Sequence, residues 1–413
     1  MRVLASAYAC EPGKGSEPAV GWNLVRQIAR FHEVWVITRE NNRESIEPAL
    51  KLAPLPNVHW IYFDLPYWAR FWKKGRRGLY LYYYMWQIGA YFLARRLHRE
   101  VRFDAAHHLT FVTYWMPSFL SLLPIPYIWG PVGGGETTPS GFWSSYSLRG
   151  KFFEILRGLA RMGGEWDPFV RRTAKRAARV YSTTEETRSR LQALGCQRVA
   201  VHSQIAMHQE EIQWLEQVPL RQGNPFRVVS IGSLLHWKGL NIGLRSFAQF
   251  HRWFPSSEYW IIGAGPEKKR LKKLAIDLGV VSNVKFWGSL PRTQVIQELG
   301  KCDVLLHPSL HDSGGWVCLE AMAAGRPVVC LDCGGPAMLL NEDTGIRVPP
   351  TSPEEAVAGL AQALEDLASD SLRCVRMGAA ARQRVQEEFD WSRKADFLRA
   401  LNSGSRPASE RIC

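Results

Sequence analysis

The 413-residue sequence has no run of about 20 uncharged apolar residues, the length that an α-helix needs to cross a bilayer. This absence excludes a polytopic membrane protein. The apolar stretch at the start ends at Glu11, so the layout of a secretory signal peptide is missing and we expect a cytoplasmic protein. The eight cysteines are scattered without regular spacing, which favours free thiols over a disulfide framework.

Acidic residues are scarce in the first half of the sequence. Residues 1–200 contain 28 Lys and Arg against 15 Asp and Glu, whereas residues 201–413 contain 24 against 23. The formal net charge of +14 therefore comes almost entirely from the first half. A positive field of this kind attracts an anionic partner, which is a phosphorylated substrate, a nucleic acid or an anionic lipid surface.

Short β-branched and aromatic runs alternate with longer amphipathic runs, which is typical of repeated βα units around a parallel sheet. We predict strands at 2–8, 33–38, 58–64, 103–109, 126–130 and 180–184, and then at 227–233, 259–263, 284–288, 304–308 and 327–332. The Pro- and Gly-containing segment 219–225 separates the two sets. The sequence thus predicts an α/β fold with two Rossmann-like, doubly wound domains facing a central cleft. The predicted boundaries are 1–218 and 226–389, with a C-terminal helix and tail at 390–413 on either domain.

The densest group of small and polar residues follows the strand predicted at 304–308. Asp312 is placed as the N-cap of a helix that contains Glu320, and the helix opens with Ser313, Gly314, Gly315 and Trp316. Small residues at a helix start let free backbone N–H groups approach an anion, and the helix dipole adds attraction for phosphate. The motif predicts a phosphate cradle with one carboxylate for a sugar and one for a ribose. The plain alternative is an N-cap followed by a solvated glutamate.

Other loops of the second half also follow predicted strands. Lys238 stands near a helix start, where a cation is unfavourable unless an anion shares the site, so it is a candidate for binding a diphosphate. The alternative is an ordinary surface lysine. Four more candidates belong to strand-end loops: Ser233, Gly263, Gly265 and Leu290.

In this order along the chain, the segments resemble the retaining glycosyltransferases of the family-4 (group 1) type, which have the two-domain GT-B fold. The resemblance is strongest over residues 228–350. It implies that Asp312 contacts the donor sugar hydroxyls, that Glu320 contacts the nucleotide ribose, and that Lys238 binds the donor diphosphate. Two positions depart from the family pattern. Asp312 replaces a Glu, which shortens its reach by one methylene, and Ser233 replaces an Arg that normally helps to neutralise phosphate.

The resemblance also assigns the loop after the first predicted strand, residues 11–17, to the donor. This loop takes the place of the family's glycine-rich loop and contains Gly13, Gly15 and Ser16. It does not match GxGxxG, because position 18 is Pro. The dinucleotide fingerprint that a dehydrogenase or epimerase needs is therefore absent.

Two further segments of the first half are candidates for the acceptor side. His107 matches the family's strand-end histidine, with His108 beside it, and the alternative is a core histidine with satisfied hydrogen bonds. The next loop stands where many relatives carry a cleft histidine, so backbone donors or an acid would replace it. Its residues are Gly133, Gly134, Gly135 and Glu136.

The mechanism that the resemblance implies keeps the leaving nucleoside diphosphate on the face that the acceptor hydroxyl attacks. The protein then stabilises the departing charge and holds both reactants in place. We assign Lys238 and the 313–316 amides to the first task, and Asp312 and His107 to the second. The sequence contains no Asp-x-Asp metal motif, and we expect neither a metal nor a cofactor.

Residues 66–103 are unusually rich in aromatic and basic residues. Basic residues precede the uncharged, tyrosine-rich segment 79–94, and they are Arg70, Lys73, Lys74, Arg76 and Arg77. Such a segment lies in a bilayer interface near anionic lipid, or it forms a buried helix beside a solvated basic loop. The first interpretation implies a glycan or lipid-linked acceptor and peripheral contact with the inner face of the membrane.

Two other functions stay open at this point. A GT-B sugar phosphorylase has the same fold but uses inorganic phosphate and often a pyridoxal cofactor, for which no lysine stands out. A nucleic-acid-binding protein explains the basic first half, because interleaved aromatic and basic residues stack on bases. It leaves Lys238, Asp312 and Glu320 without a role. We therefore predict a hexosyltransferase that uses a nucleotide-sugar donor in the biosynthesis of cell-surface polysaccharide or glycolipid, with no nucleic acid as partner.

Overall fold

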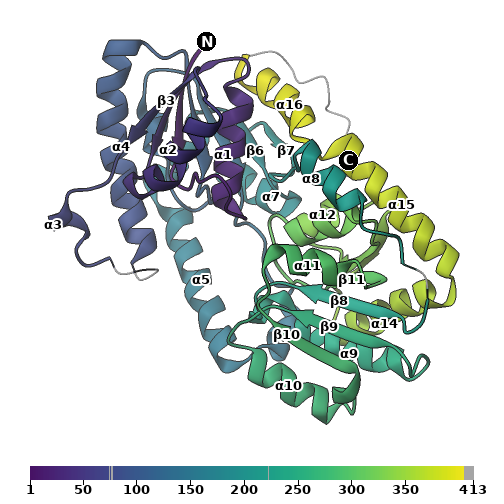
Figure 1. Cartoon of the computed structure of the whole chain (residues 1–413). Coiled ribbons are helices and arrows are strands. Elements are labelled where there is room, and N and C mark those ends of the chain that lie inside the picture. Colours follow the sequence, from purple (N-terminus) through teal and green to yellow (C-terminus); the bar gives the residue numbers. More distant parts are fainter. Residues whose placement is uncertain (74, 76–77, 222, 404–413) are drawn as a thin grey trace. The chain divides into compact units, whose positions relative to one another are not determined.

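The computed structural model describes residues 1–73, 75, 78–221 and 223–403. The chain divides into two compact units, and each unit has its own sheet (Figure 1). The first unit contains Met1–Gly135, Arg157–Gln204 and the chain from Trp391, and the second contains Glu136–Leu156 and Ile205–Asp390. The second unit thus begins before residue 226 and takes in a segment from the first half of the sequence. The C-terminal helix belongs to the first unit.

The first unit is built on a parallel sheet in the order β3-β2-β1-β4-β5-β6-β7. Its strands are β1 (Arg2–Ala7), β2 (Glu33–Thr38), β3 (Val58–Tyr62), β4 (Ala105–Thr110), β5 (Tyr127–Val132), β6 (Ala177–Ser182) and β7 (Val199–Val201). Six of them were predicted, and the short edge strand β7 was not. Strand order reverses between β1 and β4, which makes this the topological switch point.

The first unit also contains helices, several of which pack on this sheet through an apolar face. They are α1 (Glu17–Ile28), η1 (Glu40–Asn42), α2 (Arg43–Leu52), α3 (Tyr67–Arg70), α4 (Leu79–Val101), η2 (Phe119–Leu122), α6 (Pro168–Arg176), α7 (Glu185–Ala193) and α16 (Trp391–Ser403). Helix α16 packs against α1. Helix α5 (Leu148–Trp166) contains the boundary between the units, which falls after Leu156.

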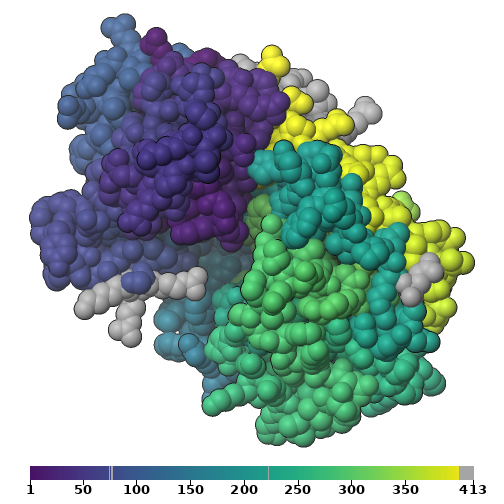
Figure 2. All heavy atoms as spheres, viewed as in Figure 1, coloured from purple at the N-terminus to yellow at the C-terminus, as the bar shows by residue number. Residues whose placement is uncertain are grey.

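Helix α4 is buried on one side and exposed on the other. Tyr83 and Trp86 are fully buried and belong to the same apolar core as Leu4 of β1. Leu81 and Phe92 are exposed, and so are the aromatic residues of α3, which stands out from the body of the first unit (Figure 2). Among the described residues, no helix combines the length and the apolar character needed to cross a membrane.

The second unit has a parallel sheet in the order β10-β9-β8-β11-β12-β13. Its strands are β8 (Arg227–Ile231), β9 (Glu258–Ile262), β10 (Val284–Gly288), β11 (Val304–His307), β12 (Val328–Leu331) and β13 (Gly345–Val348). All except β13 were predicted. The order reverses between β8 and β11, so the predicted architecture of two Rossmann-like parallel sheets is confirmed.

Helices cover both faces of the second sheet. They are η3 (Ser140–Ser145), α8 (Gln209–Glu216), η4 (His236–Lys238), α9 (Leu240–His251), α10 (Lys268–Asp277), η5 (Val281–Asn283), α11 (Arg292–Leu299), α12 (Trp316–Ala323), α13 (Gly334–Leu339), α14 (Pro353–Ser369) and α15 (Ser371–Glu388). Because side chains alternate along a strand, Val228 packs with α9 and α14, and Val229 packs with α8, α12 and α15. Phe142 and Tyr146, from the segment 136–156, lie in the first of these cores.

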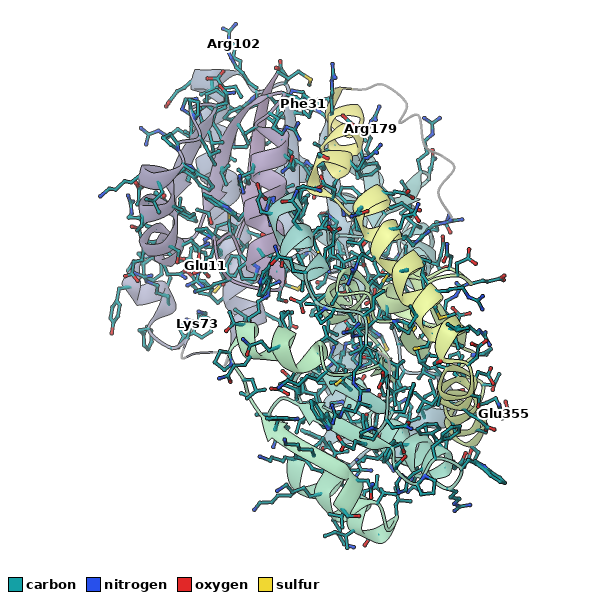
Figure 3. The ribbon with its side chains drawn as sticks, turned by 45° about the vertical axis from the view of Figure 1, so that its right-hand side comes forward. Glu11, Phe31, Lys73, Arg102, Arg179 and Glu355 are labelled. Carbon is teal, nitrogen blue, oxygen red and sulfur yellow. The ribbon has the colours of Figure 1, made fainter. Side chains whose placement is uncertain are left out.

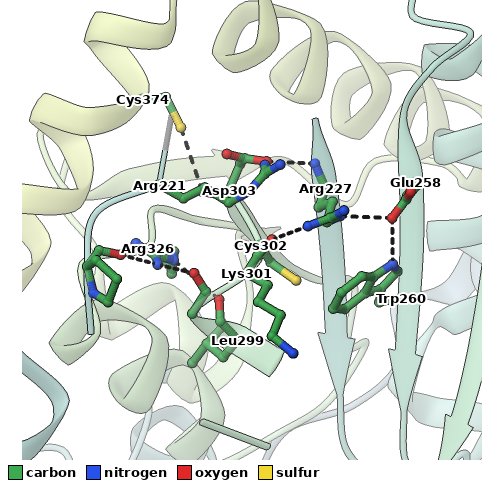
Figure 4. Close-up of polar contacts among 12 residues, drawn as sticks. Arg221, Arg227, Glu258, Trp260, Leu299, Lys301, Cys302, Asp303, Arg326 and Cys374 are labelled. Atoms are coloured by element: carbon green, nitrogen blue, oxygen red, sulfur yellow. Dashed lines mark hydrogen bonds and ion pairs between the residues drawn. The ribbon is translucent and has the colours of Figure 1, made fainter. Parts of the chain in front are cut away.

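The amino end of the second sheet is closed by a buried polar network (Figure 4). The Asp303 carboxylate accepts hydrogen bonds from the Arg221 side chain and, at 2.7 Å, from the Arg227 backbone N–H. The buried Arg326 donates to the carbonyl oxygens of Gly300 and Pro219 at 2.8 and 2.6 Å. The network ties the segment 219–221 to the strands and caps the end of α11, which makes it structural.

The carboxyl ends of the strands lie at the other end of each sheet. In the first unit, Figure 3 shows Glu11 and Lys73 at this end and Phe31 and Arg102 at the amino end. Ligands of open parallel sheets bind beyond the carboxyl ends at the switch point, so the loops after β1, β4, β8 and β11 are the places to look for a site.

Candidate functional site

The loops that follow β8, β9 and β10 are joined edge to edge by backbone hydrogen bonds. The Leu234 N–H donates to the Ala264 carbonyl at 2.9 Å, and the Gly263 N–H donates to the Gly288 carbonyl at 2.8 Å. Gly263 has φ 144°, and a Cβ there would lie 1.9 Å from the Gly232 carbonyl oxygen. The close approach therefore requires glycine. The candidates Ser233, Gly263, Gly265 and Leu290 lie on these joined loops.

Lys238 and Asp312 form an ion pair at the switch point of the second sheet. Lys238 ends η4, and Gly239 after it has φ 63° and passes so close to Pro308 that a Cβ would lie 1.8 Å from its carbonyl oxygen. The Leu310 N–H donates to the Trp237 carbonyl at 2.8 Å. These contacts fix the loop after β8 against the loop after β11, and they bring together two residues that are far apart in the sequence.

The Asp312 carboxylate is held in its ionised form. Its Oδ2 also lies 3.4 Å from Nε2 of the buried His307, and its Oδ1 accepts a 3.4 Å hydrogen bond from the Gly314 N–H. Burial opposes ionisation, but the Lys238 charge and the His307 contact outweigh it and hold the pKa of Asp312 well below its usual value. Burial lowers the pKa of His307, so this imidazole is neutral at pH 7.

The prediction that Asp312 is a helix N-cap is wrong. Helix α12 begins at Trp316, its N-cap is Gly315 with φ 80°, and no side chain caps it. Asp312 therefore lies in the preceding loop together with Ser313 and Gly314. The first-turn amides of Trp316 and Val317 have no acceptor within the helix, because an α-helix leaves its first N–H groups unpaired, so the start of α12 can bind an anion.

Glu320 projects from the second turn of α12 and pairs with Arg292 at 2.9 Å. Arg292 begins α11, directly after the loop that contains Leu290, and it also pairs with Glu211 of α8. Burial raises the pKa of Glu320, and the Arg292 charge limits this rise. The two carboxylates share one guanidinium, which leaves Glu320 with capacity to accept a further hydrogen bond.

In the first unit, His107 and His108 lie inside the sheet. His107 is fully buried, and its Nε2 lies 3.0 Å from the Gly130 carbonyl oxygen. Nε2 of His108 is 2.8 Å from the Tyr83 hydroxyl and 3.1 Å from the Gln87 amide nitrogen. Burial lowers the pKa of His108 to about 3, so it stays neutral. Both residues are core histidines whose Nε2 contacts groups inside the first unit.

The first residue of α1, directly after the loop that follows β1, is a half-buried acid that the sequence did not single out as a site residue. Gly13 and Gly15 are exposed, with open space where a Cβ would lie, and Ser16 precedes α1 with φ 62°. The Glu17 carboxylate accepts a hydrogen bond from the Phe111 N–H, and burial raises its pKa to about 6. Its position at the first residue of a helix after a glycine-rich loop was the available signal.

The glycine loop after β5 uses part of its backbone within the protein. The Gly133 N–H donates to the Val112 carbonyl and the Gly135 N–H donates to Oγ1 of Thr187, both at 3.0 Å. The Gly134 carbonyl accepts from the Arg161 side chain. Glu136 is buried and is the first residue of the second unit. The amides of Gly133 and Gly135 are therefore already engaged by protein acceptors.

The structure thus brings Lys238, Asp312, the start of α12 and Glu320 to one end of the second sheet. It also adds two residues that local patterns did not single out, His307 and Arg292. Their signals were positional, because His307 is the last residue of β11 and Arg292 follows a strand-end loop. This set can bind an anion and accept hydrogen bonds from hydroxyl groups, and it contains the cations of Lys238 and Arg292.

Comparison with known proteins agrees with this chemistry. Residues 212–384 match the family model described as glycosyl transferases group 1, and residues 14–203 match a glycosyl transferase 4-like domain. Over 193 residues the chain is 31% identical to glycogen synthase of Mycobacterium tuberculosis, which covers 46% of each protein. Over 191 residues it is 32% identical to a GDP-mannose-dependent phosphatidylinositol monomannoside mannosyltransferase of Mycolicibacterium smegmatis, covering 44% of this chain and 49% of that one.

Each of these alignments spans about half the length of the curated relative. A solved structure of sucrose-phosphate synthase from Thermosynechococcus elongatus superposes with a TM-score of 0.67 at 18% identity, over 98% of this chain and all of that one. This likeness concerns the fold, which is GT-B. The two family models together cover most of the sequence, with the group 1 match over the loops that hold Lys238, Asp312 and Glu320. The chain therefore belongs to the group 1 glycosyltransferases.

Proposed function

We propose that the protein is a hexosyltransferase that moves a sugar from a nucleotide-sugar donor to an acceptor hydroxyl, with retention at the anomeric carbon. The observation that carries the proposal is the Lys238–Asp312 pair beside the start of α12 at the switch point of the second sheet. A cation, free amides and an acid at one strand end are the groups that a sugar joined to a diphosphate requires.

The diphosphate binds at the start of α12 in this proposal. The Trp316 and Val317 amides donate to phosphate oxygens, and the helix dipole favours their negative charge. Lys238 moves from Asp312 to the diphosphate, which frees the carboxylate to accept hydrogen bonds from the sugar hydroxyls. His307 and the Gly314 N–H remain beside Asp312 after this movement and favour its ionised form, which accepts hydrogen bonds.

Glu320 is the proposed partner of the nucleotide ribose. It lies one helical turn beyond the amides at the start of α12, and the Arg292 ion pair fixes its carboxylate. A carboxylate that is held by a guanidinium on one side accepts hydroxyl groups on the other without reorganisation. Ser233, which stands in place of a family arginine, leaves Lys238 to supply most of the positive charge.

The reaction then proceeds on one face of the sugar. The bond between C1 and the diphosphate oxygen breaks, the bond between C1 and the acceptor oxygen forms on the same side, and the acceptor proton passes to a diphosphate oxygen. Lys238 and the α12 amides stabilise the negative charge that grows on the leaving group. No protein carboxylate forms a bond to C1 in this scheme, and the residues act by charge and position.

For the acceptor we propose a glycan that is linked to lipid or lies near a membrane, with the protein bound peripherally at the inner face. Tyr67, Trp68 and Phe71 are 77%, 75% and 60% exposed, and Arg70 and Lys73 lie on the same segment. Exposed aromatic residues beside cations favour the interface of an anionic bilayer. The other basic residues of the predicted run, Lys74, Arg76 and Arg77, lie outside the described residues.

The first experiment is a donor screen by isothermal titration with UDP-, GDP- and ADP-sugars, with a single-stranded oligonucleotide and inorganic phosphate as competing ligands. We expect one nucleotide sugar to bind and to be turned over with a membrane-lipid or oligosaccharide extract. Proton NMR of the product then reads the anomeric configuration. Binding of the oligonucleotide alone would contradict the enzyme assignment, and an inverted product would contradict retention.

A further inference from the structure

The buried carboxylate of Glu154, next to the site, lies within hydrogen-bond distance of two histidines. Oε1 of Glu154 lies 3.0 Å from Nε2 of His236 and 3.1 Å from Nε2 of His311. All three side chains are at least nine-tenths buried. Glu154 comes from the part of α5 that belongs to the second unit, so the cluster is built within that unit.

The two histidines sit on the two loops that form the candidate donor site. His236 is the first residue of η4, which ends at Lys238, and His311 directly precedes Asp312. A single carboxylate oxygen therefore holds the loop after β8 and the loop after β11 at the same time. It does so within two residues of the ion pair on each side.

Ring contacts limit the freedom of the cluster further. Trp237 stacks on His311 with ring centroids 5.4 Å apart, and Phe153 stacks on Trp237 at 5.5 Å. The ring of Tyr146 meets His236 edge-on at 4.9 Å. Phe153 and Tyr146 belong to the same segment of the second unit as Glu154. Residues 146–154 therefore support the loop after β8 and the loop after β11 through polar and aromatic contacts together.

We propose that Glu154 is a positioning residue of the donor site, which keeps Lys238 and the Asp312 loop at the separation that a diphosphate needs. The inference rests on the proposed function of these loops. Reacting and binding groups must be held within a fraction of an ångström, and a buried hydrogen-bonded carboxylate provides such a support. A purely structural role would change the stability of the fold and leave the affinity for a diphosphate as it is.

The test compares three variants with the wild-type protein by titration of UDP, GDP and ADP. Glu154→Ala removes the acceptor, whereas Glu154→Gln keeps an amide oxygen with two lone pairs that can still accept both imidazole N–H groups. Asp303→Ala is the matched control, because Asp303 is also a buried carboxylate that joins chain segments of the second unit, at the amino end of the sheet. Titrations are made well below the unfolding temperature of each variant.

We expect Glu154→Ala to weaken binding of the preferred diphosphate on the order of tenfold, which corresponds to about 1.4 kcal/mol, and Glu154→Gln to stay within about threefold of wild type. Asp303→Ala should lower the unfolding temperature and leave the affinity unchanged. If Glu154→Ala fails to fold, Glu154→Asp takes its place, because a side chain shorter by one methylene cannot reach both rings. Wild-type affinity in the folded Ala or Asp variant would overturn the proposal.

Hydrogen exchange of the ligand-free protein separates this inference from the proposed function. Amides of 236–239 and 311–315 should exchange faster in Glu154→Ala and not in Asp303→Ala. Binding of no diphosphate by the wild-type protein would refute the proposed function, while unchanged exchange in these two loops would refute the role of Glu154.

Discussion

The polar residues at the topological switch points of the two sheets have different surroundings. At the first, polar side chains contact groups inside the protein, because Nε2 of His107 and of His108 has a buried partner. At the second, side chains of opposite charge meet on half-buried loops, as Lys238 does with Asp312. The difference supports the proposal that the second unit binds the donor, although the excess positive charge lies in the first half of the sequence.

Histidine shows the same contrast at the level of one residue type. His108 packs against Tyr83 and Gln87, and burial keeps it neutral with a pKa of about 3. His307 is equally enclosed but touches the Asp312 carboxylate, and His236 and His311 share Glu154. These histidines of the second unit therefore contact carboxylates, whereas His108 in the first unit contacts neutral groups of the core.

The largest effect should come from removing the one cation of the donor loops. Lys238→Ala should lower the rate of sugar transfer by about 10²–10³-fold, because a preorganised group that stabilises leaving-group charge contributes on this scale. Lys301→Ala is the control, since Lys301 pairs with Glu298 at the other end of the second sheet. Steady-state kinetics with the preferred donor measure both. A transfer rate for Lys238→Ala equal to that of Lys301→Ala would contradict the proposal that Lys238 stabilises the leaving group.

The next effect concerns acid stability and should appear in the first unit. The pKa of His108 is about 3 when folded and 6.5 when unfolded, so the unfolded chain binds the proton first and stability is lost as pH falls from 6.5 towards 3. Between pH 6.5 and 4.5 this costs about 2 kcal/mol. The depressed pKa of Asp312 means that its pair contributes stability above pH 3.8 and keeps it throughout this window.

Hydrogen exchange at pH 6.5 and 4.5, corrected for intrinsic rates, reads each unit separately. We expect β4 and α4 to lose protection at pH 4.5 while β8 keeps its protection, and we expect His108→Gln to reduce the loss. Strand β11 does not serve as the reference, because burial also lowers the pKa of His307 at its end. An equal loss of protection in both units would show that the histidine environments do not set the acid response.

A smaller effect should separate the two carboxylates that share Arg292. Glu320→Gln should weaken binding of a ribonucleoside diphosphate by about tenfold and of its 2′-deoxy analogue by less, because a buried acceptor of a ribose hydroxyl is lost. Glu211→Gln perturbs the same guanidinium from the other side and should leave affinity near wild type. Equal losses in both variants would assign the effect to Arg292 instead of to a ribose contact.

The smallest effect should appear at the basic surface of the first unit. Lys73→Gln should weaken sedimentation with phosphatidylserine vesicles by on the order of fivefold, since a cation near an anionic surface contributes about 1 kcal/mol. Arg102→Gln is the matched change, because Arg102 lies at the amino end of the same sheet (Figure 3). If both variants lose the same amount, the binding reflects net charge, and the 67–73 segment has no special role in it.

Local patterns were sufficient for most of the framework. Runs of β-branched and aromatic residues predicted β2 and β10 with their observed limits. Strand β7 was missed because it has only three residues, and β13 because its four residues include Gly345 and Arg347. The N-cap assignment of Asp312 failed because Gly315 adopts a left-handed conformation at the true helix start. Sequence spacing does not show which of several small residues takes that conformation.

Contacts between distant segments were beyond local patterns. Lys238 and Asp312 were each predicted from a strand-end position, but their pairing depends on the neighbouring places of β8 and β11 in the sheet. Glu154 contacts His236 and His311, which are 82 and 157 residues away in the sequence, and no motif near Glu154 predicts these contacts. The sequence also did not predict that 136–156 belongs to the second unit, because an apolar residue such as Phe142 can pack in either core.

The most direct test of the account is a crystal structure of the protein with the nucleoside diphosphate that binds best. The account predicts phosphate oxygens within hydrogen-bond distance of Lys238 Nζ and of the Trp316 and Val317 amides, with a ribose hydroxyl on Glu320. A diphosphate bound away from the start of α12, with the Lys238–Asp312 pair left intact, would contradict it.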